Sequence, residues 1–200
     1  HIIRTVEKSL LRLQRDHIDL LQLHDRDNLT PLDETLRALD DLVTQGKVRH
    51  IGACNFSAAE MVQADGFSQQ HGKARFTSNQ VHYSLACRDI EFDIAKAAQQ
   101  SDHALMIWSP LSGGYLSGKY AIKHEDDKQQ GRRSKLNFPP VDVARVDPIV
   151  DELIAIGGEM GCSAATVAHA WLLGRAEVTT VIIGAKNEQQ LLQNLEAQNL

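Results

Sequence analysis

The chain has little of what marks a disulfide-stabilised, membrane-spanning or nucleic-acid-binding protein. Its three cysteines, Cys54, Cys87 and Cys162, are odd in number and widely spaced, which argues against a disulfide framework and indicates free thiols in a reducing cytoplasm. No apolar run approaches the roughly 18 residues of a membrane span. The formal net charge of -5 gives no electrostatic basis for binding nucleic acid. We therefore expect a globular cytoplasmic protein.

The length of the chain limits the fold. Its 200 residues are enough for one substantial domain, whereas a complete eight-stranded α/β barrel usually needs roughly 250 or more. The sequence starts at His1 and a helical pattern begins at once, so we expect a piece of a longer protein. No linker or longer internal repeat divides it, which predicts a single domain over residues 1–200.

What the chain does have is a regular alternation of short apolar runs and amphipathic helices. The runs predict strands at 18–23, 48–54, 77–83, 104–109 and 178–183. Helical periods and capping signals predict helices over 4–15, 32–43 (capped by Thr30) and 91–100, and further helices that begin after Ser57, at Asp147-Pro148, after Ser163 and after Asn187. This alternation is typical of an α/β barrel or an open parallel sheet, in which ligands bind at the carboxyl ends of the strands.

The alternation stops in the segment 112–147. Glycines, a charged run and Pro139-Pro140 replace the periodic pattern there. A connection of this length inside a compact domain is usually functional or disordered.

Polar residues follow the predicted strands, at the edge where a ligand would bind. His24 ends the first strand, where a neutral imidazole either holds a substrate oxygen or is a structural group. Asn55 and Gln80 end the next two strands, and their amides suit a carboxamide or serve as strand-end caps. Trp108 either stacks on a flat ring or belongs to the core. The run 24–27 has poor spacing for metal ligands, so we expect no metal.

Two segments have the composition of an anion-binding site. Ser109–Gly114 is a glycine-bearing turn after a strand, with Lys119 downstream, and backbone amides together with a cation bind phosphate. Gly184–Asn187 leads into a helix whose N-terminus is electrically positive. Phosphate commonly binds after the last two strands of an α/β barrel, which is where both segments lie.

Taken together, these segments resemble the aldo-keto reductase family, and most of all the bacterial branch that also includes the potassium-channel β subunits. The resemblance extends over nearly the whole chain, and several independent motifs occur in the family's order. The matching segments are Ile18–His24, Gly46–Phe56, Asn79–Ser84, Trp108–Gly114, Leu116–Tyr120 and Gly184–Asn194.

The resemblance implies a fold, a reaction and a cofactor. The family folds as an (α/β)8 TIM barrel, of which this chain would supply about five βα units, strands four to eight. Members reduce aldehydes or ketones to alcohols with NADP(H). Of the family's catalytic Asp, Tyr, Lys and His, only the His has a counterpart here, His24. The other three are expected upstream of His1, and this segment alone is expected to be inactive.

The resemblance also implies which residues bind the cofactor. The nicotinamide would contact Cys54, Asn55, Gln80 and Trp108. The pyrophosphate would contact Ser109, Pro110, Leu111, Ser112, Gly113 and Lys119. The adenosine-phosphate end would contact Gly184, Lys186, Gln190, Gln193 and Asn194. Gln190 stands where many members have an Arg that grips the 2′-phosphate, so NAD(H) is the alternative cofactor; Arg132 or Arg133 would compensate from the 112–147 loop, which would cover the cofactor.

Three functions are compatible with the sequence. The first is an NADP(H)-dependent carbonyl reductase. The second is a cofactor-binding redox sensor or channel-type regulatory subunit with little turnover. The third is an unrelated phosphate-binding barrel isomerase, for which Asp25 and Asp27 are the only candidate acids at strand ends. If these five strands are all that the polypeptide has, two sheet edges stay open, and in that case we expect an oligomer or a partner that covers them.

Overall fold

The computed structural model describes residues 1–120 and 136–200. Its strands are β1 (Ile18–Leu23), β2 (Val48–Cys54), β3 (Phe76–His82), β4 (Ala104–Trp108) and β5 (Val178–Val181). Its α-helices are α1 (Ile2–Leu13), α2 (Leu32–Thr44), α3 (Ala58–His71), α4 (Ile94–Ser101), α6 (Val143–Met160), α7 (Ala164–Leu173) and α8 (Glu188–Glu196). The short 3-10 helices are η1 (Asp89–Glu91), η2 (Ser112–Ser117) and η4 (Ala197–Asn199). None of the helices formed by these residues combines the length and the apolar composition that a membrane-spanning helix needs.

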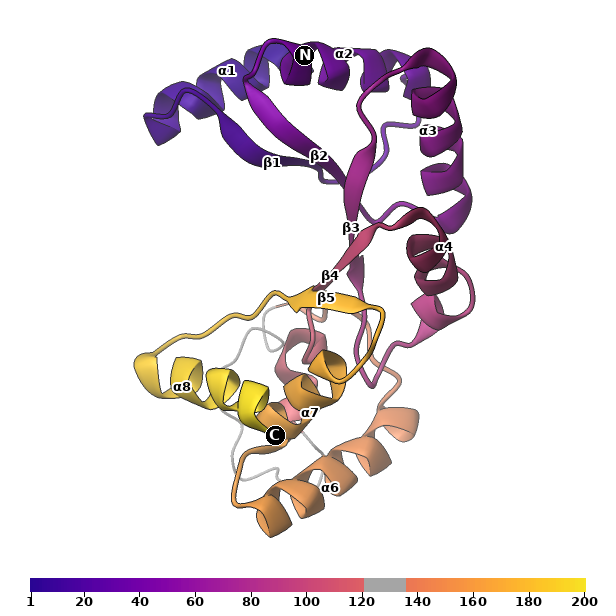
Figure 1. Cartoon of the computed structure of the whole chain (residues 1–200). Coiled ribbons are helices and arrows are strands. Elements are labelled where there is room, and N and C mark those ends of the chain that lie inside the picture. The colour runs from indigo at the N-terminus through magenta and orange to yellow at the C-terminus, as the bar shows by residue number, and fades with distance from the viewer. Residues whose placement is uncertain (121–135) are drawn as a thin grey trace. The chain divides into compact units, whose positions relative to one another are not determined.

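The strands form one 5-stranded sheet in the order β1-β2-β3-β4-β5, and helices alternate with them along the chain (Figure 1). The pairs β1–β2 and β2–β3 are parallel. A strand order that follows the chain order is that of a barrel, because a doubly wound sheet reverses its order at a switch point. The predicted α/β fold class is confirmed, with this chain contributing five strands of the barrel.

The chain folds as two compact units. The first unit comprises His1–Val81 and Phe92–Leu105, and the second comprises His82–Glu91 and Met106–Leu200.

The first unit is held by a core between its helices and strands. Val6 of α1, Leu36 and Leu39 of α2 and Ile51 of β2 are buried in a single cluster. The helix α3 begins as predicted, because Ser57 and Glu60 form a reciprocal capping box. The expectation that Thr30 caps α2 is wrong. Pro31 is the N-cap residue, and the Thr30 hydroxyl donates to the carboxylate of Asp27 at 2.6 Å.

The second unit is held by a core among η2, α6 and α7. Tyr115 and Leu116 of η2 pack with Val146 and Val150 of α6 and with Ala168 of α7. This core fixes the position of η2, which directly follows the end of β4.

The helix α6 begins earlier than the sequence predicted. The Asp147-Pro148 pair suggested a start there, because proline favours the first helical position. Instead the Asp142 side chain accepts a hydrogen bond from the Arg145 amide at 3.4 Å and caps a helix that starts at Val143. Val146 is only 1% exposed, so burial stabilises the turn that precedes Pro148. The segment predicted as a loop over 112–147 therefore contains η2 and the first turn of α6.

Two neighbouring glycines of α6 give a test of how closely α6 and α7 approach. A Cβ atom added at Gly157 would lie 2.7 Å from the backbone carbonyl oxygen of Cys162, whereas a Cβ atom at Gly158 would meet nothing within 4 Å. We expect Gly157→Ala to destabilise the protein by about 1–3 kcal/mol because backbone must move. Gly158→Ala should instead stabilise it by about 0.5–1 kcal/mol through helix propensity. Urea unfolding of both variants measures the difference, and equal effects would contradict this packing.

Candidate functional site

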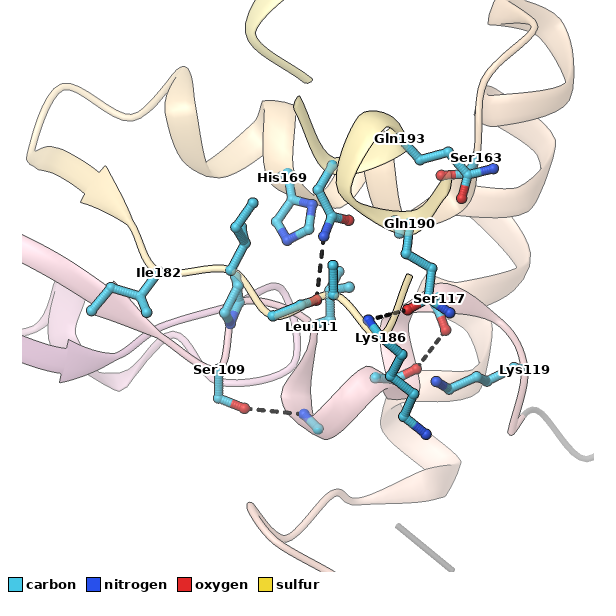
Figure 2. A pocket seen from close by; sticks show the side chains of 18 of the residues that line it. Ser109, Leu111, Ser117, Lys119, Ser163, His169, Ile182, Lys186, Gln190 and Gln193 are labelled. Carbon is cyan, nitrogen blue, oxygen red and sulfur yellow. Dashed lines mark hydrogen bonds between the residues drawn. The ribbon is translucent and has the colours of Figure 1, made fainter. Parts of the chain in front are cut away.

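A pocket of about 630 Å³ lies within the second unit. It is lined by the turn that follows β4, by α7, by the segment 182–186 after β5 and by α8 (Figure 2). Both strands present their carboxyl ends to it, as expected for a ligand site in a parallel α/β fold. The volume falls within the range of about 300–1,000 Å³ for small-molecule sites.

The lining of the pocket is positively charged. Among the described residues that line it, Lys119 and Lys186 are cations and none is a carboxylate. Neutral hydrogen-bonding side chains complete the polar lining: Ser109, Ser117, Ser163, His169, Gln190, Gln193 and Asn194. Since the chain as a whole has a net charge of -5, this local excess of positive charge indicates an anionic ligand.

The turn after β4 takes an unusual backbone path. Ser109 and Ser112 have φ of 52° and 47°, in the left-handed region that non-glycine residues rarely adopt. The Ser109 hydroxyl accepts from the Gly113 amide at 3.0 Å, and the Ser112 amide donates to the Ser109 carbonyl at 2.8 Å. The Gly114 amide donates to the Leu111 carbonyl at 2.9 Å. These amides are thus paired within the turn, and the cation of this segment carries the attraction for an anion.

Glycine at position 114 makes room for that cation. Gly114 has a φ of 93°, and an added Cβ atom would lie 3.2 Å from the Lys119 ammonium nitrogen. The Lys119 ammonium also lies 5.1 Å from the centre of the Tyr120 ring, in a cation–π arrangement. The ring of Tyr120 contacts the ammonium group, and the missing side chain at Gly114 leaves the space that the group occupies.

The segment after β5 is fixed by side chains of α8. Asn187 caps α8, as predicted, by accepting from the Gln190 amide at 2.9 Å. The Gln190 carbonyl oxygen in turn accepts from the Lys186 amide at 2.9 Å. Asn194 donates to the Gly184 carbonyl at 3.4 Å. Gln190 and Asn194 therefore shape the loop that carries Lys186 as well as lining the pocket.

Trp108 stacks with two other rings. The His82 imidazole lies 4.5 Å from it, centre to centre, with an interplanar angle of 22°. The Phe138 ring lies 5.9 Å away on an almost parallel plane, at 8°. Phe138 itself lines the pocket. A flat ligand ring that stacks on this tryptophan must therefore take a place beside or instead of Phe138.

The predicted residues of the first unit also come together. His24 is exposed directly after β1, and its carbonyl accepts from the Asn55 side chain at 3.3 Å. The Asn55 backbone amide donates to the Gln80 backbone carbonyl at 2.9 Å, and the Gln80 side-chain amide donates to the side-chain oxygen of Gln22 at 2.9 Å. Cys54 is buried, and desolvation followed by the nearby charge of Asp25 raises the pKa of its thiol. The ends of β1, β2 and β3 thus form one polar edge.

The predicted cofactor residues divide into four sets. Those that line the pocket of the second unit are Trp108, Ser109, Pro110, Leu111, Gly113, Lys119, Gly184, Lys186, Gln190, Gln193 and Asn194. Those of the first unit are Cys54, Asn55 and Gln80. Ser112 is buried under the turn, where its hydroxyl shares a hydrogen bond of 2.9 Å with that of Ser84. Arg132 and Arg133 lie outside the described residues.

Sequence reasoning missed Ser117, Ser163 and His169 as pocket residues. The sequence predicts Ser163 only as a helix cap, and it is one, since its hydroxyl accepts from the Thr166 amide at 3.1 Å. His169 had a usable signal, because it is the only charged or titratable side chain in the apolar helix α7. Within the described part of the chain, no group of three or more His, Cys, Asp or Glu side chains could hold a metal ion.

Consecutive strands with a pocket at the carboxyl ends of β4 and β5 are the arrangement of a barrel-type α/β protein, and the two lysines of the pocket suit an anionic small molecule. Residues 1–200 match the model of the Aldo/keto reductase family, and the chain belongs to that family. The predicted family resemblance is thereby confirmed.

Curated proteins with different descriptions are similar to this chain. A Bacillus subtilis protein described as an uncharacterized oxidoreductase, YrpG, is 34% identical over 98% of this chain and 58% of its own length. A probable voltage-gated potassium channel subunit beta of Arabidopsis thaliana is 30% identical over 98% of the chain and 61% of its own length. A putative aryl-alcohol dehydrogenase of Saccharomyces cerevisiae is 31% identical over 96% and 51%. The chain thus spans between half and two thirds of the length of these relatives.

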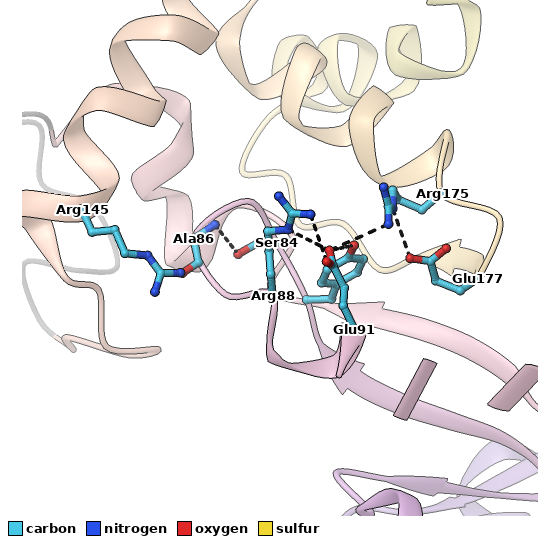
Figure 3. A network of polar contacts seen from close by, with 8 residues as sticks. Ser84, Ala86, Arg88, Glu91, Arg145, Arg175 and Glu177 are labelled. Carbon is cyan, nitrogen blue, oxygen red and sulfur yellow. Dashed lines mark hydrogen bonds and ion pairs between the residues drawn. The ribbon is translucent and has the colours of Figure 1, made fainter. Parts of the chain in front are cut away.

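A charged network in the second unit joins the segment after β3 to the end of α7 (Figure 3). Arg88 donates to both oxygens of Glu91, at 2.8 and 2.9 Å, and the buried Tyr83 hydroxyl donates to Glu91 at 2.6 Å. Arg175 lies 3.9 Å from Glu91, and both arginines lie 5.4 Å from the centre of the Trp171 ring. The hydrogen bonds from Arg88 and then Tyr83 lower the pKa of Glu91 to about 2.

The lowered pKa of Glu91 predicts how stability depends on pH. Its carboxylate stabilises the fold fully above the unfolded value of 4.5, and this contribution is lost as the pH falls from 4.5 through about 2. We expect Glu91→Gln to destabilise the protein by about 2 kcal/mol at pH 7, a figure that allows for screening of its 25% exposed side chain.

Urea unfolding of the wild type and of Glu91→Gln at about pH 7 and about pH 3 tests this dependence. The difference between the two proteins should shrink by more than half at the lower pH. Glu159→Gln, at an exposed position of α6, is the control and should change stability little at either pH. A Glu91→Gln effect that is independent of pH would contradict the assignment.

Proposed function

We propose that the whole protein is an oxidoreductase that uses NADP(H) to reduce aldehydes or ketones to alcohols. The observation that carries the proposal is the pocket of the second unit. Most of the residues that the family resemblance assigned to the cofactor line this one pocket, although they come from two separate stretches of sequence. Its cations suit the anionic phosphates of a dinucleotide. Its volume is large enough to hold part of a dinucleotide molecule.

The residues present fit a nicotinamide dinucleotide in several respects. Lys119 and Lys186 would pair with its phosphates, and the absent side chain at Gly114 leaves room for the Lys119 ammonium group beside the turn. Trp108 would stack on a planar ring, with displacement of Phe138. The family resemblance assigns the carboxamide to the side-chain amides of Asn55 and Gln80, which belong to the polar edge of the first unit.

The cofactor, when bound, supplies a hydride to the carbonyl carbon. In this chain His24 would hold and orient the carbonyl oxygen of the substrate, since its imidazole is exposed after β1. The Tyr that protonates that oxygen, with its Asp and Lys, would come from a part of the protein outside this chain. The proposal therefore assigns this chain the cofactor-binding part of the reaction and one catalytic residue.

The preference between NADP(H) and NAD(H) depends on a neutral residue. Gln190 contributes no charge toward a 2′-phosphate, and its carbonyl oxygen is engaged by the Lys186 amide. Lys186 then remains the cation of this segment, and we propose that its charge favours NADP(H). NAD(H) is the alternative cofactor.

A second candidate function is a cofactor-binding regulatory subunit with little turnover. The likeness to proteins described as potassium channel β subunits favours it. The two candidates share the pocket and differ in turnover, so saturable cofactor binding with negligible carbonyl reduction by the whole protein would select the regulatory function.

In either case we propose that further strands, a partner or a second copy cover the end strands β1 and β5. The free thiols of Cys54, Cys87 and Cys162 support a reducing, cytoplasmic location.

Removal of one pocket cation should weaken cofactor binding. We expect Lys186→Ala to raise the Kd for NADPH about 10-fold, because a charged hydrogen bond is lost, and to raise the Kd for NADH less. Titration of intrinsic tryptophan fluorescence with each cofactor measures both constants. Lys96→Ala, which removes an exposed cation of the first unit, is the matched control. Equal effects of the two substitutions would contradict a phosphate contact at Lys186.

Substitution of His24 should separate catalysis from cofactor binding. We expect His24→Ala to lower kcat/KM for an aldehyde such as 4-nitrobenzaldehyde about 100-fold in the whole protein, because the carbonyl oxygen loses its positioning contact. The Kd for NADPH should stay within about twofold. Steady-state kinetics and fluorescence titration give the two values, and an unchanged kcat/KM would remove His24 from the reaction.

A further inference from the structure

The pocket contains a buried imidazole that the proposed chemistry does not use. His169 of α7 is 2% exposed, and its ring lines the pocket (Figure 2). Neither of its nitrogens has a hydrogen-bond partner among the described residues. Burial alone lowers the pKa of His169 to about 4, so the ring is neutral at physiological pH and offers one donor and one acceptor.

An unpartnered histidine at this position is costly for the fold. A buried polar group without a partner costs about 1–3 kcal/mol, whereas an aliphatic side chain of similar size packs without that cost. The neighbours on α7 show that aliphatic residues suit this environment, since Ala168 is 1% exposed and Leu172 is fully buried. The imidazole therefore weakens the empty protein, and a ligand that supplies the missing partner would recover the loss.

The position of His169 limits which part of a ligand it can meet. Figure 2 shows Lys119 and Lys186 on one side of the pocket and the His169 ring well apart from both. The cations attract phosphate, while a neutral imidazole pairs with an uncharged donor or acceptor. The pocket also includes the neutral amides of Gln193 and Asn194. This set of neutral groups is suited to the polar edge of a heterocyclic base or its carboxamide.

We propose that His169 hydrogen-bonds an uncharged ring edge of the bound dinucleotide, either the adenine or the nicotinamide carboxamide, and so contributes to recognition of the cofactor's base. This inference rests on the proposed function, because it takes the ligand of the pocket to be a nicotinamide dinucleotide. According to this proposal, His169 lowers the stability of the cofactor-free protein and raises its affinity for the cofactor.

The test compares His169→Leu and His169→Gln with the wild type in the whole protein. We expect His169→Leu to raise the Tm of the cofactor-free protein and to raise the Kd for NADPH about 3- to 10-fold, the effect of one neutral hydrogen bond. His169→Gln keeps a donor and an acceptor and should bind NADPH within about threefold of the wild type. Differential scanning fluorimetry and fluorescence titration give the two readouts.

Either of two results would overturn the proposal. If His169→Leu binds NADPH as the wild type does, the nitrogens meet no ligand and the histidine is a packing residue. If the Leu and Gln variants lose the same affinity, the shape of the ring and not its hydrogen bonds supports binding. A lower Tm of cofactor-free His169→Leu would show that the histidine stabilises the empty protein, which also contradicts the proposal.

Fragments of the cofactor distinguish the two possible ring edges. If adenine is the partner, His169→Leu weakens binding of ADP-ribose and leaves nicotinamide mononucleotide unaffected; if the carboxamide is the partner, the order is reversed. A wild-type protein that binds neither NADPH nor NADH would refute the proposed function itself. That result is distinct from a wild type that binds both cofactors and a His169→Leu variant that binds them equally well.

Discussion

The pocket of the second unit depends on the backbone path of the turn that follows β4. Ser109, Ser112, Gly113, Gly114 and Gly118 all have positive φ, so the chain turns sharply within a few residues. Such conformations cost free energy, and the costs are largest at the two serines. They are offset where the turn is anchored: the Ser84 and Ser112 hydroxyls share a buried hydrogen bond, and Tyr115 and Leu116 are held in the core with α6 and α7.

Several properties of the site follow from this turn. It directs Trp108 and Ser109 toward the pocket at the end of β4, and it returns the chain so that Lys119 lies over Gly114. The second cation of the pocket, Lys186, is positioned independently of this turn. It precedes the capped N-terminus of α8, where the Gln190 side chain accepts a hydrogen bond from the Lys186 backbone amide. Two separately stabilised segments thus bring like charges to one pocket. The two lysine ammonium groups repel each other when the pocket is empty, and a bound anion would relieve that repulsion.

Elsewhere in the second unit, around Glu91, charged side chains of opposite sign are paired with one another. Glu91 pairs with the guanidinium groups of Arg88 and Arg175, which stabilise its carboxylate, and each arginine also lies 5.4 Å from the centre of the Trp171 ring. Here every charge has a partner, and the network contributes to stability. In the pocket the cations meet no carboxylate among the described lining residues, and His169 has no partner there. The contrast between a satisfied network and an unsatisfied pocket is what distinguishes a structural cluster from a ligand site.

The resemblance to the family, and no local pattern, assigned most of the predicted residues that line the pocket. The sequence by itself determined the strands, the order of the motifs, the helix cap at Ser57 and the glycine-bearing turn after β4. These features are local: alternating apolar runs, a Ser-x-x-Glu box at Ser57 and glycines at a turn have the same meaning in any fold. Only the tertiary structure decided that α6 starts at Val143 before Pro148, that Phe138 stacks on Trp108 and that His169 is buried without a partner. The last two depend on contacts between residues far apart in sequence, and the start of α6 depends on its local Asp142 cap together with the burial of Val146 in the cluster of Tyr115 and Leu116. The burial and pairing of a side chain are set by neighbours that no local pattern specifies.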